Sequence, residues 1–188
     1  VEMAKKYGVE LVVRSSLTSE EGTVVKEVVK MEKMLITAVA ADRNTVRISA
    51  IGVKDEPGIA FKIFNTLAKN NINVDIILQS VGRNGTKDIS FTVSEEDLKE
   101  SLAILEEKKE VLTIKELTYS TDVAKVSIVG AGMLSNPGVA AKMFESLFIS
   151  NININMISTS EIRITVLIDE KDTEKAMIAI HDGFGLND

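Results

Sequence analysis

The strongest constraint on this 188-residue chain is that it contains one segment twice. Residues 55–80 read DEPGIAFKIFNTLAKNNINVDIILQS, and residues 135–160 read SNPGVAAKMFESLFISNININMISTS, which align without a gap. Most positions that differ exchange one apolar residue for another. Self-similarity of this kind predicts two homologous structural units. The identical pairs include Pro57/Pro137, Gly58/Gly138, Lys62/Lys142, Phe64/Phe144 and the triplet Asn71-Ile72-Asn73, repeated as Asn151-Ile152-Asn153.

The first repeat predicts an α+β fold. A mostly alternating apolar pattern predicts a strand at 46–53, and apolar residues at helical spacing predict a helix at about 57–70 with Pro57 as its first residue. Segments 72–81 and 87–93 predict a hairpin around its glycines, an acid-rich start after Ser94 predicts a helix to about 107, and 111–118 predicts a last strand. The order β-α-β-β-α-β is the ferredoxin-like pattern, an antiparallel sheet with its helices on one face.

The second repeat predicts the same elements except the last strand. We expect strands at 123–129, 152–158 and 161–168 and helices at 137–150 and 170–182, with a hairpin seven residues shorter because Asp88–Phe91 matches Glu161–Ile164. The remaining residues 183–188 are too few and too glycine-rich for a fourth strand, whereas residues 34–41 form an apolar segment without a unit. We therefore predict that 34–41 pairs in the second sheet, beside 123–129 or 161–168. The first domain (42–119) would then be inserted into the second (34–41 plus 120–188).

Composition narrows the range of partners. The net charge is −6 and no basic residues cluster, which argues against nucleic acid and against an anionic membrane surface. No apolar stretch approaches the ~20 residues of a membrane span. The absence of cysteine excludes disulfides and thiolate chemistry, and a cytoplasmic location is expected. Residues 1–6 resemble neither a signal peptide nor a natural start, so the chain is expected to be cut from a longer protein.

Polar residues recur near both predicted helix starts. The segments Asp55–Gly58 and Ser135–Gly138 precede a helix, where free backbone N–H groups suit a carboxylate and glycine permits close approach; plain helix capping is the alternative. Further polar groups are expected beside the helix start and at the strand ends, where they either contact a ligand or satisfy loop backbone. These are Asn73, Asp75, Gln79 and Ser80 in the first repeat and Asn153, Asn155, Thr159, Ser160 and Glu161 in the second.

No catalytic constellation is found. The run Gly130-Ala131-Gly132 lacks the third glycine of a dinucleotide loop, and His181, the sole histidine, has no evident nucleophile partner. An acylphosphatase-like enzyme would need an arginine in a phosphate loop, and an RNA-recognition sheet would need stacking aromatics, which this sequence lacks. We therefore predict a binding protein without catalytic residues or a metal site.

The repeats resemble a known family. Residues 46–81 closely resemble the first ACT domain of aspartate kinases, and residues 126–168 resemble the second, including the run STSEIR at 158–163. Residues 9–23, VELVVRSSLTSEEGT, resemble the last strand of the amino-acid-kinase catalytic domain, which makes 1–33 the tail of that domain and a linker.

This resemblance implies a regulatory role. The family phosphorylates the side-chain carboxylate of aspartate with ATP, opening lysine, threonine and methionine synthesis; ATP and Mg belong to the catalytic domain, whose motifs are absent, so this fragment needs no cofactor. The expected partners are threonine, lysine or both as feedback effectors, the catalytic domain, and a second copy in a homodimer with ACT units side by side. The alternative is a stand-alone amino-acid-binding regulator without a kinase.

The same resemblance implies two effector sites, with effectors bound between units. Threonine would contact Asp55, Gly58, Ala60 and Gln79 of one unit and Asn153 and Ile154 of a neighbour. In the second site, Glu161 could meet the ammonium group of lysine. The remaining expected contacts are Ile59, Asn73, Val74, Asp75 and Ser80 around the first site, and Met133, Ser135, Gly138, Val139, Asn155, Thr159 and Ser160 around the second.

Overall fold

The computed structural model describes residues 4, 7–17, 21–25, 36–82, 84–130 and 136–186. They belong to two units, Val1–Met34 and Leu35–Asp188. In the smaller unit, β1 (Leu11–Val13) and β2 (Thr23–Val25) form an antiparallel hairpin. The segment 9–23, interpreted from the sequence as one strand, thus contains β1 and reaches the first residue of β2.

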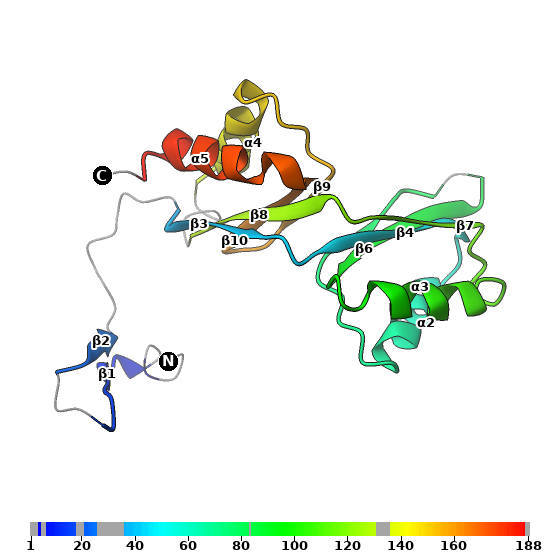
Figure 1. Cartoon of the computed structure of the whole chain (residues 1–188), viewed down its shortest axis with the longest axis horizontal. Coiled ribbons are helices and arrows are strands. Elements are labelled where there is room, and N and C mark those ends of the chain that lie inside the picture. Colours follow the sequence, from blue (N-terminus) through cyan, green and yellow to red (C-terminus); the bar gives the residue numbers. More distant parts are fainter. Residues whose placement is uncertain are drawn as a thin grey trace. The chain divides into compact units, whose positions relative to one another are not determined.

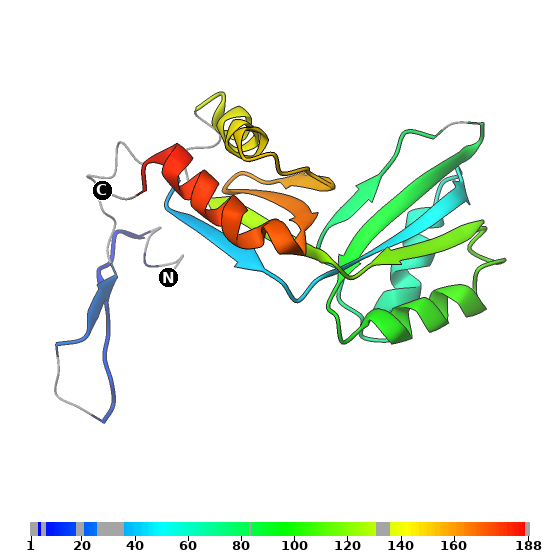
Figure 2. The same ribbon diagram turned by 45° about the horizontal axis from the view of Figure 1, so that its top comes forward.

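The larger unit contains two domains, each an antiparallel four-stranded sheet with two helices on one face (Figures 1 and 2). This is the α+β, ferredoxin-like architecture predicted from the repeats. In the first domain the strand order is β5-β6-β4-β7. Its elements are β4 (Val46–Lys54), α2 (Ile59–Ala68), β5 (Ile77–Gln79), β6 (Thr86–Val93), α3 (Leu98–Glu107) and β7 (Glu116–Ser120).

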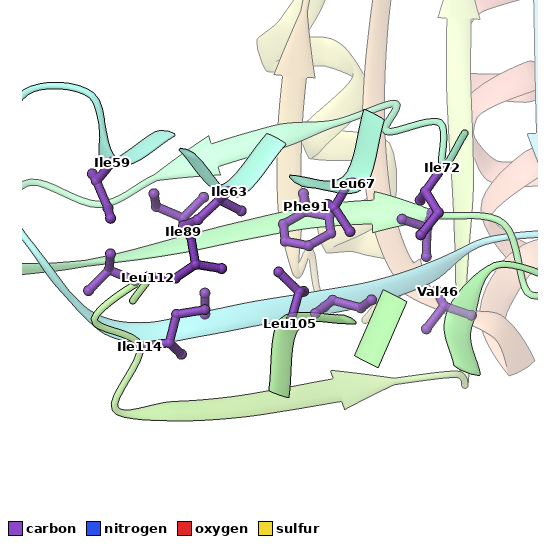
Figure 3. Packing of buried hydrophobic residues seen from close by; sticks show 14 residues of the cluster. Val46, Ile59, Ile63, Leu67, Ile72, Ile89, Phe91, Leu105, Leu112 and Ile114 are labelled. Carbon is purple, nitrogen blue, oxygen red and sulfur yellow. The ribbon is translucent and has the colours of Figure 1, made fainter. Parts of the chain in front are cut away.

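The core of the first domain follows the two periodicities of its sequence. On β4 the alternate residues Val46, Ile48 and Ala50 are fully buried, and on α2 every fourth residue, from Ile59 through Ile63 to Leu67, is buried. Figure 3 shows Ile63 and Leu67 of α2 and Phe91 of β6 among the side chains of this one core. The apolar face of β4 and the apolar face of α2 therefore pack against each other, which is why both elements form here.

The second domain is completed by a strand from before the first. Its order is β3-β8-β10-β9, and in β3 Ala38 lies opposite Val129 of β8 and Asp42 opposite Lys125. Segment 34–41 is expected from the sequence to lie beside 123–129 or 161–168, and its described part pairs with 123–129, although β3 extends one residue further. The first domain is therefore inserted into the second. The elements are β3 (Ala38–Asp42), β8 (Val123–Val129), α4 (Val139–Ile149), β9 (Met156–Thr159), β10 (Arg163–Asp169), η1 (Glu170–Asp172) and α5 (Thr173–Phe184).

Several predicted boundaries are wrong, each for a local reason. The strand expected at 111–118 begins only at Glu116, because 111–113 form a turn in which Thr113 has a φ of 56° and Leu112 packs into the core. The strand expected at 72–81 contributes only Ile77–Gln79 to the ladder. The second helix begins at Leu98 rather than directly after Ser94, because the Ser94 hydroxyl group donates to Asp97 at 2.8 Å and holds a turn before the helix.

The helices are short and amphipathic. The longest described helix, α5, has 12 residues and buries Thr173, Ala176 and Ile180 against the second core. Phe184 and Leu186, in a segment expected to lie beyond the last helix, also pack on that core. Among the described residues no helix is long and apolar enough to cross a membrane.

The two domains share an apolar and an ionic contact. Ile76 of the first domain packs with Val123, Met156 and Leu167 on the face of the second sheet opposite its helices. Beside them, the Lys125 ammonium group lies 2.6 Å from an Asp75 carboxylate oxygen and 2.9 Å from one of Asp42, with only 13% of the lysine side chain exposed. Lys125 thus ties the segment before β5 to β3 and β8.

We predict that Lys125→Met lowers the free energy of unfolding by about 1–2 kcal/mol, between the values for exposed and buried ion pairs. The substitution keeps the aliphatic stem but leaves two carboxylates unmatched. Urea denaturation measures the difference. Lys171→Met is the control, because Lys171 is largely exposed and lies 3.6 Å from Asp169; equal effects of the two substitutions would contradict a role for the interdomain pair.

The same pair predicts a dependence on pH. Burial by itself lowers the pKa of Lys125, but the hydrogen bonds and charges of Asp75 and Asp42 outweigh it and raise the pKa above its ordinary value of 10.5. The stabilisation is then complete below pH 10.5 and is lost as pH rises through the higher folded-state pKa. The stability difference between wild type and Lys125→Met should therefore shrink as pH rises above 10.5; a difference that stayed constant on that alkaline side would contradict this assignment.

Candidate functional site

The candidate site of the first domain lies where α2 begins. Pro57 and Gly58 form a turn, and the helix begins at Ile59, so the prediction of Pro57 as the first helical residue is wrong. Gly58 has a φ of 91°, a left-handed conformation that costs other residues about 1–2 kcal/mol. A Cβ atom added to Gly58 would meet nothing within 4 Å. The start of the helix therefore faces open space, where its first N–H groups have no partner inside the helix.

A β-bulge places the residues that precede this helix. The register of β4 against β6 shifts between Ala50 and Val53, and Gly52 in the bulge has a φ of 67°. The Asp88 carboxylate accepts a hydrogen bond from the N–H group of Gly52 at 2.8 Å. Beyond the bulge the ladder continues, with Val53 opposite Lys87. The bulge thus extends the sheet toward the start of α2.

The extended ladder brings an acid and a base together. The Asp55 carboxylate lies 3.0 Å from the Lys87 ammonium group, and only 10% of the Lys87 side chain is exposed. Gly82 of the β5–β6 loop lies so close to Asp55 that any side chain at position 82 would displace the carboxylate. The N–H group of Asp55 donates to the Gly85 carbonyl oxygen at 2.9 Å. Asp55 is therefore held by the hairpin loop as well as by β4.

Glu56, the other acid before the helix, is bound separately. Lys54 lies 2.8 Å and Lys62 3.3 Å from its carboxylate oxygens. The side-chain hydrogen bond from Lys54, followed by that from Lys62, lowers the pKa of Glu56. Asp55 and Glu56 precede the helix rather than lying in its first turn, which contains no acid.

Gln79 and Ser80 lie at the same end of the sheet. Gln79 ends β5 opposite Ile89, whose side chain belongs to the core between the sheet and its helices. Because alternate residues of a strand share a face, Lys87, two residues before Ile89, lies on the same helix side of the sheet as Ile89 and Gln79. The Ser80 hydroxyl group accepts a hydrogen bond from the Asp88 N–H group at 2.9 Å and closes the hairpin. Ile59 contributes its side chain to the core, whereas Ala60 is half-buried.

The second domain repeats part of this arrangement. Gly138 has a φ of 99° and precedes the buried Val139, the first residue of α4. Thr159 ends β9, while Ser160 and Glu161 lie in the turn, where the Ser160 N–H group donates to the Arg163 carbonyl oxygen at 2.7 Å. Met133 and Ser135, two predicted effector contacts, lie outside the described residues.

The repeated Asn-Ile-Asn triplet ends a helix. Asn71 and Asn151 adopt left-handed conformations with φ of 58° and 52°, as asparagine tolerates after a helix. The following Ile72 and Ile152 are buried, and the N–H group of Ile72 donates to the Leu67 carbonyl oxygen at 3.1 Å. The alignment of the two repeats does not by itself indicate this role.

The polar residues after the triplet lie away from the helix start of their own domain. Asn73 follows the far end of α2, a helix of ten residues that spans about 15 Å, and the N–H group of Asp75 donates to the Thr92 carbonyl oxygen at the opposite end of β6. The expectation that these residues lie beside the helix start is therefore wrong within one domain. Asn153, exposed, has the same place after α4.

The residues at the two matching positions 75 and 155 differ in their partners. Asp75 pairs with Lys125 of the second domain, whereas the Asn155 side-chain amide donates to an Asp169 carboxylate oxygen at 3.1 Å within its own domain. Their neighbours Val74 and Ile154 pack on the first and second cores.

Comparison with known proteins agrees with this geometry. The model of the ACT domain family matches residues 46–108 and 126–184, once for each domain. An aspartokinase from Bacillus sp. (strain MGA3) is 45% identical over 188 residues, covering 100% of this chain and 46% of that protein. The chain thus spans about half the length of the curated relatives it matches.

Two solved structures are similar over nearly their whole length. One, of aspartokinase alpha and beta subunits, is 47% identical with a TM-score of 0.75, covering 80% of this chain and 99% of that chain. The regulatory subunit of aspartate kinase from Thermus thermophilus, in ligand-free form, is 42% identical with the same TM-score and coverage. The chain belongs to the ACT domain family, as a regulatory region of the aspartokinase type with two ACT domains.

Lys87, Asp88 and Gly52 were not among the predicted site residues. The signal that could have found them is the longer hairpin of the first repeat, because the extra residues must extend a strand or a loop. In the structure they extend β6, which begins at Thr86 and pairs with residues beyond the bulge.

We predict that Asp88→Ala lowers the free energy of unfolding by about 1–2 kcal/mol, because the Gly52 N–H group loses its acceptor. Asp88→Asn keeps an acceptor oxygen and should lose less than half as much. Urea denaturation of both variants checks this. If the two substitutions cost the same, the carboxylate oxygen does not hold the bulge.

Proposed function

We propose that this chain is the amino-acid sensor of an aspartokinase, and that it binds threonine, lysine or both to impose feedback inhibition. The residues Val1–Met34 would connect it to a catalytic domain that phosphorylates aspartate with ATP and Mg. The observation that carries the proposal is the repeated left-handed glycine at a helix start, open to solvent, in a chain of which 100% aligns with an aspartokinase.

The chemistry of the first site suits a free amino acid. A carboxylate is favoured at a helix start by backbone N–H groups and by the helix dipole, by roughly 0.3–1 kcal/mol. An ammonium group would find the carboxylate of Asp55, which is about half exposed. Gln79, exposed at the end of β5, can donate to and accept from a side-chain hydroxyl group.

A complete site would need a second domain beside the first. Asn73, Asn153 and the half-buried Ile154 lie far from the glycine of their own domain. They could approach a ligand at the glycine of another domain if two domains associate through sheet edges. The edge strands β5 and β9 expose Ile77 and Ile157, and exposed edges invite pairing.

We predict that Gln79→Ala weakens threonine binding about tenfold, the factor that ~1.4 kcal/mol implies, because one side-chain hydrogen bond is lost. Asp55→Ala should weaken binding by a similar factor. Gly58→Val should weaken it more, because a branched side chain would fill the open space and would also strain the left-handed backbone. Isothermal titration calorimetry measures the affinities, with circular dichroism to verify folding.

Thr159→Ala is the matched control, since Thr159 ends the corresponding strand of the second domain. It should leave the first-site affinity for threonine within twofold of wild type. Wild-type affinity in a folded Gln79→Ala protein would contradict the site, and failure of the wild type to bind either threonine or lysine would contradict the sensor function itself.

We also predict a homodimer with domains side by side. Sedimentation at tens of micromolar, with effector present, should give a dimer mass. Replacing Ile77 and Ile157 together by Lys should dissociate it, because charged residues on an edge strand oppose pairing. Ile178→Lys, at a more exposed position on α5, should not. A monomer mass for the wild type would contradict this prediction.

A further inference from the structure

We infer that Lys87 makes the first site selective for amino acids with an uncharged side chain and against those with a second ammonium group. This inference rests on the proposed function of the same site. It assigns a specificity-determining role to a residue that is absent from the expected effector contacts.

Lys87 occupies a fixed position beside the acid of the site. It belongs to the ladder of β6, opposite Val53, so its backbone cannot move without opening the sheet. Its side chain is nine-tenths buried and its ammonium group lies 3.0 Å from Asp55. A lysine that swung outward would leave this contact and expose its aliphatic stem, so the charge stays at the site.

Both acids before α2 thereby already have lysine partners. Asp55 is matched by Lys87, and Glu56 is matched by Lys54 and Lys62. An amino acid with a neutral side chain carries no net charge, so it can place its carboxylate near Lys87 and its ammonium group near Asp55 without adding charge to the site. Each ligand charge then faces one of opposite sign.

A diamino acid brings one positive charge more. Its second ammonium group finds no unmatched carboxylate between β4 and α2, because both acids there already have lysine partners. A second ammonium group that approaches Lys87 meets a like charge in a partly buried place, where like charges repel more strongly than in water. Lys87 therefore penalises the diamino acid without any steric clash.

The second domain offers no equivalent cation in its described part. Among the residues that the structure describes there, the ladder between β8 and β10 begins at Val129 and Arg163, without the extension that carries Lys87 in the first domain. The residue that matches Lys87 in the sequence is Ser160, and the residue that matches Asp88 is the exposed Glu161. The first repeat therefore has a lysine where the second has a serine, and the two sites would differ in the charge that they offer to a ligand.

The test is a ratio of affinities. Threonine and lysine are each titrated by calorimetry into the 188-residue wild type, Lys87→Met and Lys87→Gln, two variants that remove the charge and retain most of the side-chain volume. The ratio of lysine affinity to threonine affinity should rise about tenfold, because this is the factor that one like-charge interaction in a partly buried site gives. Lys62→Met removes a lysine that is half exposed and pairs with Glu56, and it should leave the ratio within twofold.

A further variant assigns the effect to this site. In a Lys87→Met/Gln79→Ala double variant, the gain in lysine affinity should be smaller than in Lys87→Met alone. The threonine affinity should fall as well, because both ligands use the same end of β5. An unchanged ratio in both folded single variants overturns the role of Lys87 while leaving the sensor function intact. Absence of binding of both amino acids to the wild type overturns the proposed function, and this inference with it.

Discussion

The pairing of β3 with β8 is the interaction on which the rest of the structure depends. Without β3 the second sheet would have β8 as an edge strand, and the buried Ile36 would lose its place in the second core. Because β3 precedes the first domain and β8 follows it, the pairing closes a loop that contains the whole first domain. The two domains are thus linked by two chain segments, and the Lys125 pairs with Asp42 and Asp75 form at this junction.

The residues that the two repeats share mainly build the fold. Gly58 and Gly138 supply the left-handed turn before a helix, and Asn71 and Asn151 supply the left-handed residue after it. The acid and the base that pair beside α2 differ between the repeats. Lys87 pairs with Asp55 in the first domain, while the sequence counterparts of these two residues in the second are serines. Duplication has therefore preserved the frame and left the electrostatics of the two sites free to diverge.

The β-bulge connects the shared backbone of the repeats with the charges that differ between them. A glycine in the left-handed conformation and one carboxylate acceptor, Gly52 and Asp88, allow the β4–β6 ladder to resume beyond the irregularity. The resumed ladder positions Lys87 under the start of α2. A backbone irregularity that adds little to the core thus decides which charged group faces a ligand at this end of the sheet.

The sequence by itself determined the duplication, the order of the elements and the inserted topology, because apolar periodicity and an unmatched fourth strand are local patterns. It also indicated the helix starts through the repeated Pro-Gly pairs. Only the tertiary structure decided that Asn73 and Asp75 lie away from the helix start, that Asp75 pairs with Lys125, and that Lys87 is buried against Asp55. Strand register, a bulge and ion pairs between residues 32 or 50 positions apart depend on how distant segments meet, and no local pattern in the chain specifies them.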